Sequence, residues 1–262
     1  MIRKCGTLVA VVGAIVSCVG SARATLYTIG DGGLDWGFGL SIDGISESGG
    51  VGGIALTSGS GTIISVCTDI SGVVYLGSSY NYVQVAFSAQ GGLDGLNPNW
   101  GFGNPGTGVL TPAQKAVASE AIQNAAYLFY EHQSVLTGGS VADKAALQLA
   151  VWEALYDTGN PLGFSFGTGR FDASGGSATE TAALATALSW LTTDVGLDGT
   201  KSHLQFSGNL LQAQDLSGNP QTGVQEMLFN LTPVPEASTV IAGLMLLLPM
   251  GVATTRIWRR NR

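Results

Sequence analysis

One cysteine stands out because of where it lies in the chain. The sequence of 262 residues has three cysteines, and two of them, Cys5 and Cys18, fall in an apolar leader that we expect to be cleaved. Cys67 then remains as a single thiol without a disulfide partner, which is an awkward state in an oxidising compartment. Deep burial or a covalent cap would each remove that hazard.

A glutamine in the middle of the chain is the second chemical candidate. Gln148 and Trp152 are four residues apart in a helical pattern, so they share one face. The adjoining stripe is apolar and consists of Leu147, Val151 and Leu155. Burying an unpaired carboxamide is costly. Gln148 therefore needs a hydrogen-bond partner or a covalent bond.

The strands that must position the thiol can be predicted from residue alternation. Residues 61–87 alternate between β-branched or apolar residues and polar ones, with Gly-Ser breaks between the runs. We expect antiparallel strands at "TIISVCTDI", "GVVYLG" and "YNYVQVAF", with Cys67 inside the first. Strand character returns later, in "HLQFSGNLL" and "GVQEMLFNLTP".

Three helices are predicted between these two groups of strands. Thr111 as N-cap, Pro112 and Gln114 form a capping-box pattern that opens a helix reaching about Gln133. Ser140 caps a second helix, "VADKAALQLAVWEALYD", and "SATETAALATALSWLTTDVG" forms a third. This order predicts an α+β fold, namely an antiparallel β-sandwich or barrel with an inserted helical subdomain.

The first 24 residues are typical of a secretory signal peptide. Arg3 and Lys4 precede an apolar stretch that forms the signal helix, and an Ala-Arg-Ala cleavage site follows it. A permanent membrane anchor is the alternative. Residues 25–233 would then form the body of the protein.

Residues 234–262 have the features of a second sorting signal. A Pro-Glu turn precedes an apolar run from about Val240 to Ala253, which approaches the ~17–20 residues of a membrane helix. The arginines behind this run favour a cytoplasmic tail. The residues that carry the signal are Pro235, Glu236, Arg256, Arg259 and Arg260.

This arrangement resembles the PEP-CTERM sorting signal of Gram-negative bacteria, although Ala237 stands where the second proline usually lies. The resemblance implies processing by an exosortase-type membrane protease as a partner. The chain would be held in the inner membrane by its C-terminal helix and would then reach the cell surface or the extracellular space. An ordinary tail anchor is the alternative.

The body is acidic and rich in glycine. Residues 25–233 contain four Lys and Arg against seventeen Asp and Glu, and the whole chain contains 39 glycines. Nucleic-acid binding is excluded as a function class because it needs basic patches. The glycines fit turns between short strands, and the interleaved apolar residues argue against disorder.

Together, "VCTDI" and "LQLAVWE" resemble the thioester domains of bacterial surface proteins, in which a strand cysteine bonds to a helix glutamine. The opening of the helix at Thr111 and the segment "VQEMLF" near the end belong to the same resemblance. It implies a Cys67–Gln148 thioester, shielded from water by Trp152 and Tyr156. An amine or hydroxyl on another surface would open this bond and stay attached to Gln148.

Other chemistry has weaker support. Cys67 could be a small buried hydrophobe, with Gln148 bonded to a neighbouring strand. A cysteine hydrolase would need His132 or His203 as a base, and neither lies in a catalytic motif. The sequence indicates neither a cofactor nor a metal site. Turn residues that could suggest calcium, and tryptophans that could stack on sugars, are Asp31, Asp35, Asp43, Trp36, Trp100 and Trp190.

Two functions therefore follow from the sequence, and neither is that of an enzyme. The first is a covalent adhesin that captures an amine- or hydroxyl-bearing surface or exopolysaccharide, once per molecule. The second is a non-covalent structural component of the extracellular matrix or biofilm.

Overall fold

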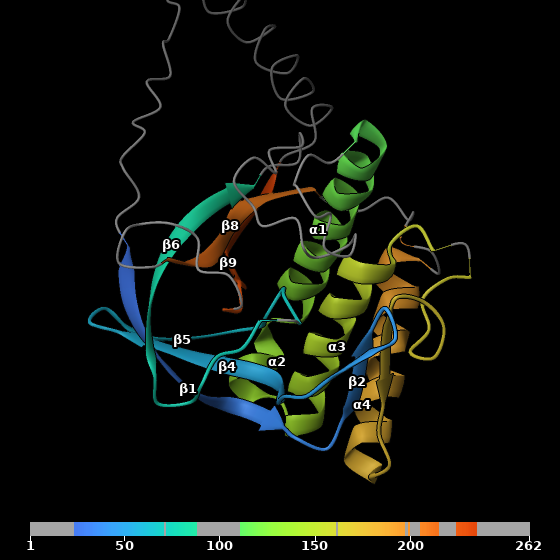
Figure 1. Cartoon of the computed structure of the whole chain (residues 1–262), viewed down its shortest axis with the longest axis horizontal. Helices are drawn as coiled ribbons and strands as arrows, with labels where there is room; N and C mark the ends of the chain where they lie inside the picture. Colours follow the sequence, from blue (N-terminus) through green and yellow to red (C-terminus); the bar gives the residue numbers. More distant parts are fainter. Residues whose placement is uncertain are drawn as a thin grey trace, which may run out of the picture.

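A computed structural model describes residues 24–70, 72–87, 111–160, 162–196, 199, 205–214 and 224–234 (Figure 1). The predicted sorting signal after residue 234 lies outside these residues, as does all but the last residue of the predicted signal peptide. No helix among the residues described is long and apolar enough to cross a bilayer.

The larger of two antiparallel sheets has six strands in the order β5-β4-β1-β6-β8-β9. These strands are β1 (Thr25–Asp35), β4 (Val51–Ser58), β5 (Gly61–Ser65), β6 (Ser79–Phe87), β8 (Gln205–Gln214) and β9 (Met227–Val234). The smaller sheet has the order β3-β2-β7. Its strands are β2 (Gly39–Ile42), β3 (Ile45–Glu47) and β7 (Phe171–Ser174).

The two edges of the six-stranded sheet meet. Just after β5, Cys67 forms an isolated antiparallel bridge with Met227 at the start of β9. The Thr68 N–H donates to the Glu226 carbonyl at 2.8 Å, and the Leu228 N–H donates to the Val66 carbonyl at 3.2 Å. These bonds join the two edges at the start of β9 and close the sheet into a barrel there.

The helices lie beside the curved sheet, on the right of Figure 1. They are α1 (Pro112–His132), α2 (Ser134–Gly138), α3 (Val141–Asp157) and α4 (Ala178–Trp190), which continues into the π-helical turn η1 (Leu191–Val195). Capping boxes open the three long helices, at Thr111, Ser140 and Ser177. Each box satisfies backbone N–H groups that have no partner inside the helix.

Helix α3 forms the centre of the core. Every residue from Ala145 to Asp157 is buried, because α1, α4, β1, β4 and β7 surround the helix. A helix that is enclosed in this way must satisfy its polar side chains inside the protein. Gln148 and Glu153 are among these side chains.

The α+β class, the antiparallel sheets and the three long helices predicted from the sequence are confirmed. Two local predictions are wrong. Cys67 lies after β5, in the bridge that closes the barrel, rather than inside a strand. Residues 72–77 form a loop rather than a strand, because their apolar side chains line a cavity instead of packing into a sheet.

The buried carboxyl of Glu153 predicts how stability depends on pH. Its Oε1 accepts a 2.7 Å bond from the Ser165 N–H, and Oε2 has no partner among the described residues. Burial, together with the nearby charge of Asp157, raises the pKa of Glu153 from 4.5 to about 9. Between pH 4.5 and about 9, the folded state therefore keeps the Glu153 proton, whereas the unfolded state releases it. Stability should fall as the pH rises from 4.5 to about 9.

Glu153→Gln keeps an acceptor for Ser165 and cannot ionise. We expect its unfolding free energy to rise relative to wild type by at least about 1 kcal/mol as pH increases through this window. Urea denaturation at several pH values measures the difference. Glu120→Gln, at an exposed position of α1, is the matched control. Parallel pH curves for wild type and Glu153→Gln would contradict this account.

Candidate functional site

The bridge that closes the barrel determines what the thiol of Cys67 faces. Cys67 stands opposite Met227, so the residue two positions before Met227 is the diagonal neighbour on the same face. That residue is Gln225. The Cys67 thiol donates a hydrogen bond to Gln225 Oε1, with Sγ and Oε1 2.9 Å apart.

The thiol itself is enclosed. Cys67 is 2% exposed and is the free cysteine among the described residues. Burial, followed by the charge of Asp69, raises the pKa of the Cys67 thiol well above its ordinary value of 9.0. The thiol is therefore protonated at neutral pH, and its proton is directed at the Gln225 carboxamide.

Gln148 meets the backbone of Cys67. The Cys67 N–H donates to Gln148 Oε1 at 2.7 Å, and Gln148 Nε2 donates to the Cys67 carbonyl at 2.8 Å. The carboxamide thus takes the place of a neighbouring strand and satisfies both backbone groups of one residue. The structure brings Cys67 and Gln148 together, and this contact fixes the position of Cys67 against α3.

A second glutamine, Gln123, also binds both backbone groups of one barrel residue, which is not a cysteine. Gln123 of α1 donates from Nε2 to the Phe206 carbonyl at 2.9 Å and accepts from the Phe206 N–H at 2.6 Å. Both glutamines are buried and both dock a helix on one residue of the barrel. This repetition identifies the Gln148 contact as a means of positioning, because none of the described residues places a thiol beside Gln123.

Gln225 is held by its backbone, while its side chain reaches a cavity. The Tyr82 hydroxyl donates to the Gln225 carbonyl at 3.2 Å. Residues 72–77 pack directly on the same backbone, since a Cβ at Gly72 would lie 2.7 Å from the Gln225 nitrogen. A glycine is therefore required at this close approach.

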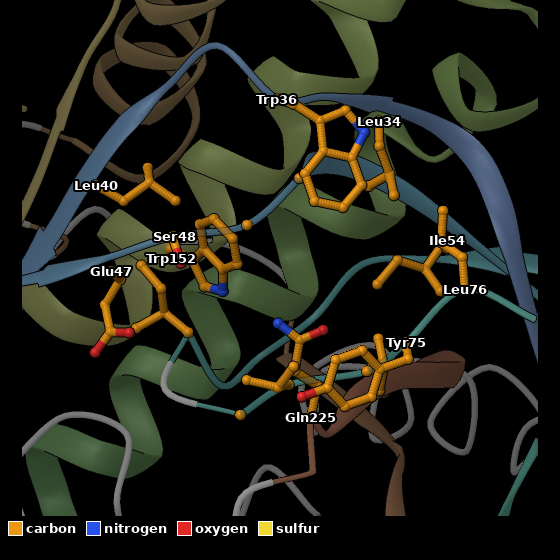
Figure 2. Close-up of a pocket in the computed structure, with 16 residues that line it drawn as sticks. Leu34, Trp36, Leu40, Glu47, Ser48, Ile54, Tyr75, Leu76, Trp152 and Gln225 are labelled. Carbon is orange, nitrogen blue, oxygen red and sulfur yellow. The ribbon is translucent and has the colours of Figure 1, made fainter. Parts of the chain in front are cut away.

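The cavity beside Gln225 has a volume of about 570 Å³ (Figure 2). Its walls come from the segment around β3, from residues 72–76 and from α3. Figure 2 shows the Gln225 carboxamide between Trp152 and Tyr75. Gln225 is part-buried, whereas Gln148 is 1% exposed. A molecule that enters the cavity can therefore approach Gln225.

The two residues predicted to shield the site have different positions. Trp152 is 2% exposed and lines the cavity together with Gln225. Its indole Nε1 has no hydrogen-bond partner among the described residues, and Figure 2 shows the nitrogen edge turned toward Gln225. Tyr156 is not part of the cavity wall. Its hydroxyl accepts the Ile70 N–H at 3.3 Å and so anchors the chain just after Cys67.

The residues of the alternative hypotheses have other partners. His132 contacts Asp194 at 2.7 Å and stacks on Trp190 at 3.9 Å between ring centroids. The hydrogen bonds of Cys67 are with the two glutamines, and His203 lies outside the described residues. His132 therefore has a structural partner in place of a thiol.

The three aspartates considered for calcium accept local hydrogen bonds or form an ion pair. Asp31 and Asp35 accept backbone N–H groups within three residues, and Asp43 pairs with Arg170 at 2.8 Å. Among the described residues, no three His, Cys, Asp or Glu side chains gather as metal ligands would. Trp36 is the tryptophan of this group that lines the cavity.

Sequence reasoning missed Gln225 as a site residue. The signal that could have found it is the pattern of an apolar residue, Gln, one further residue and two apolar residues at 224–228. Gln148 also follows an apolar residue, and its neighbouring tryptophan drew attention to it. Choosing between the two glutamines requires the register of the closing bridge, which the sequence does not reveal.

No protein-family model matches this chain, and no curated protein matches it. A search of solved structures finds the N-terminal domain of the pilus tip adhesin Cpa of Streptococcus pyogenes. The match has 13% identity and a TM-score of 0.35, and it covers 77% of this chain and 95% of that chain. Similarity at this level establishes neither a shared fold nor a shared function.

The positioning role of Gln148 can be measured against that of Gln123. Gln148→Leu leaves the N–H and carbonyl of Cys67 buried without partners, and Gln123→Leu does the same at Phe206. Each substitution should lower the free energy of unfolding by about 2–6 kcal/mol, because it orphans two groups that cost about 1–3 kcal/mol each. Urea denaturation measures the loss.

Gln133→Leu is the control, since Gln133 is exposed at the end of α1. Its effect should stay within about 0.5 kcal/mol. A Gln148→Leu variant as stable as this control would show that the contact does not anchor Cys67.

Proposed function

We propose that this chain is an exported surface protein that attaches covalently to a partner through an internal thioester between Cys67 and Gln225. The observation that carries the proposal is the thiol of Cys67, directed at the Gln225 carboxamide with 2.9 Å between Sγ and Oε1. Export is expected from the two sorting signals in the sequence.

Three features favour Gln225 over Gln148 as the acyl partner. The thiol contacts Gln225, whereas Gln148 contacts the backbone of Cys67. The Gln148 contact is repeated by Gln123 at a place without a thiol. Gln225 lines a cavity that a nucleophile can enter, and Gln148 is enclosed in the core.

The thioester forms in one balanced exchange. Sγ of Cys67 attacks Cδ of Gln225, and the thiol proton passes to the carboxamide. The S–C bond forms, the C–N bond breaks, and ammonia leaves with the proton. An amide is a poor acyl donor, so the step depends on a rigid arrangement; well-oriented intramolecular pairs reach effective molarities of ~10⁵–10⁸ M. Gln148, Tyr82 and the closing bridge supply that rigidity.

The partner is captured when its nucleophile opens the thioester. An amine or hydroxyl attacks the carbonyl carbon at residue 225, the C–S bond breaks, and Sγ takes the proton. The partner remains joined to residue 225, and Cys67 returns to a thiol. The protein reacts once, so it acts as an adhesive rather than an enzyme. Apolar cavity walls limit the competing attack by water.

Trp152 has a second role in this mechanism. Both steps pass through a tetrahedral centre at the Gln225 carbon, with negative charge on oxygen. The Trp152 Nε1–H lies in the same cavity and has no partner among the described residues. A donor that is already in place for developing charge is a strong contribution to catalysis of acyl transfer.

Two observations favour the non-covalent alternative, a structural component of the extracellular matrix. Cys67 is buried with a raised thiol pKa, and the bonds of Gln148 to its backbone make a complete hydrogen-bonded unit. A core of this kind is stable without any reaction. Mass spectrometry separates the two functions.

The test is the intact mass of the recombinant body, residues 25–233, followed by peptide mapping after incubation with methylamine. We expect a mass lower by one ammonia, no alkylation of Cys67 before treatment, and a methylamide at residue 225 afterwards. Cys67→Ser should restore the full mass. A methylamide at residue 148 would instead identify Cys67 and Gln148 as the thioester pair, as predicted from the sequence. A full mass, with glutamine intact at both positions, would leave the structural alternative.

Trp152→Phe tests the role of the indole N–H. This variant keeps an aromatic wall and removes the donor, so the rate of methylamine capture should fall by about tenfold or more. Trp190→Phe is the control, because Trp190 stacks on His132 rather than lining the cavity. Equal rates in wild type and Trp152→Phe would limit Trp152 to a role in packing.

A further inference from the structure

Two tyrosines of β6 bind the two sides of the cavity beside Gln225. Tyr80 and Tyr82 are two residues apart, so they lie on the same face of the strand, and their rings meet edge to face with 6.4 Å between centroids. The Tyr82 hydroxyl donates to the Gln225 carbonyl at 3.2 Å. The Tyr80 hydroxyl accepts the Tyr75 N–H, also at 3.2 Å. One strand therefore holds both the residue that faces the thiol and the loop beside it.

The loop of residues 72–77 packs beside Gln225 but is poorly buried. At its start, Gly72 packs on the Gln225 backbone. At its end, the Gly77 N–H donates to the Ile29 carbonyl at 2.7 Å. The large exposed side chains between these two points line the cavity, namely Val73, Tyr75 and Leu76. Core packing therefore does little to hold the middle of the loop.

Tyr80 is the side chain that anchors the middle of this loop. Among the described residues, its bond to the Tyr75 N–H is the one hydrogen bond that a side chain makes to the backbone of residues 72–77. The Tyr75 carbonyl accepts the Ser78 N–H at 3.0 Å, which closes a turn within the same segment. Figure 2 shows the Tyr75 ring beside the Gln225 carboxamide. Without the Tyr80 bond, the loop can move away from Gln225 and admit water.

We propose that these two tyrosines serve different steps of the thioester chemistry. Tyr82 positions Gln225 for formation of the bond, and Tyr80 holds the 72–77 loop against the cavity so that water does not hydrolyse the bond. The inference rests on the proposed thioester and assigns two positioning residues to it. The loop takes the shielding role that the sequence predicted for Tyr156, which is not part of the cavity wall.

Formation is the step that depends on Tyr82. An amide is a poor acyl donor, so Sγ of Cys67 must stay aligned with Cδ of Gln225. The Tyr82 hydroxyl fixes the backbone from which that carboxamide extends. Once the S–C bond exists, the bond itself sets the distance between the two atoms. Loss of the Tyr82 hydroxyl should therefore slow formation and leave the lifetime of the thioester nearly unchanged.

Hydrolysis is the step that depends on Tyr80. Water attacks the carbonyl carbon at residue 225, the C–S bond breaks, and one proton of the water passes to Sγ of Cys67. The remaining hydroxyl stays on the carbon, so residue 225 becomes a glutamate. The Tyr80 hydroxyl bonds to the loop rather than to either reacting residue. Its loss should therefore shorten the lifetime of the thioester and leave formation nearly unchanged, because apolar walls that exclude water limit hydrolysis.

The chemical state of residue 225 in the full chain records which step has failed. Methylamine in denaturant first converts each surviving thioester into a methylamide. Peptide mapping over time then finds glutamine where the bond never formed, glutamate where it was hydrolysed, and methylamide where it persisted.

Tyr82→Phe should raise the fraction with glutamine, through formation that is slower by about three- to tenfold. Tyr80→Phe should raise the fraction with glutamate, through hydrolysis that is faster by about three- to tenfold. Tyr130→Phe removes a hydroxyl from a ring that packs on Phe206 of the barrel, and this control should match wild type.

A purely structural role would change the two steps together, because a destabilised fold both misaligns the reacting atoms and admits water. A rise of the same species in both variants would therefore overturn the division of roles. So would a reversed assignment of the two species, or proportions equal to those of wild type. Urea denaturation checks that both variants fold, as expected for substitutions that keep the ring.

The anchor on the loop is also testable without a thioester. A wild type that keeps its full mass and glutamine at residue 225 would show failure of the proposed function alone. In Cys67→Ala, the Tyr75 amide should exchange its hydrogen about tenfold faster after Tyr80→Phe, because Tyr80 accepts that N–H. Tyr82→Phe should leave this exchange unchanged, as measured by NMR. Equal exchange in all three chains would overturn the role of Tyr80, whatever the chemistry of Cys67.

Discussion

The register of a single β-bridge controls the rest of the site. Pairing Cys67 with Met227 closes the barrel and places the Gln225 side chain diagonally beside the thiol. Side chains alternate between the two faces of a strand, so a slip of one residue would turn Gln225 away from Cys67. The bonds of Thr68 and Leu228 to the opposite edge resist such a slip. The bridge that closes the barrel therefore also aligns the Cys67 thiol with the Gln225 carboxamide.

Two helices hold residues of the barrel in position from inside the core. Gln148 in α3 and Gln123 in α1 each satisfy both backbone groups of one barrel residue. A glutamine used this way fixes its strand partner in two directions, since both ends of the carboxamide are bound. Cys67 is therefore held by β9 on one side and by α3 on the other, and its side chain has little freedom to leave Gln225.

The cavity follows from a loop that does not become a strand. Residues 72–77 pack over the Gln225 backbone at Gly72 and then present apolar side chains to the cavity. Glu47 and Trp36 reach the same space from another part of the chain. An aromatic and acidic cavity therefore lies beside Gln225, the hydrogen-bond partner of the buried thiol. In the proposed function, this cavity admits a partner and limits water.

The sequence by itself determined the α+β class, the three long helices with the caps of the first two, and the chemical interest of Cys67 and Gln148, because capping residues, periodicity and a lone thiol are local features. It also predicted two sorting signals, which lie almost wholly outside the described residues. Only the tertiary structure decided which glutamine faces the thiol. The two candidates lie 81 and 158 residues from Cys67, and barrel closure, which no local pattern encodes, sets their distances from the sulfur.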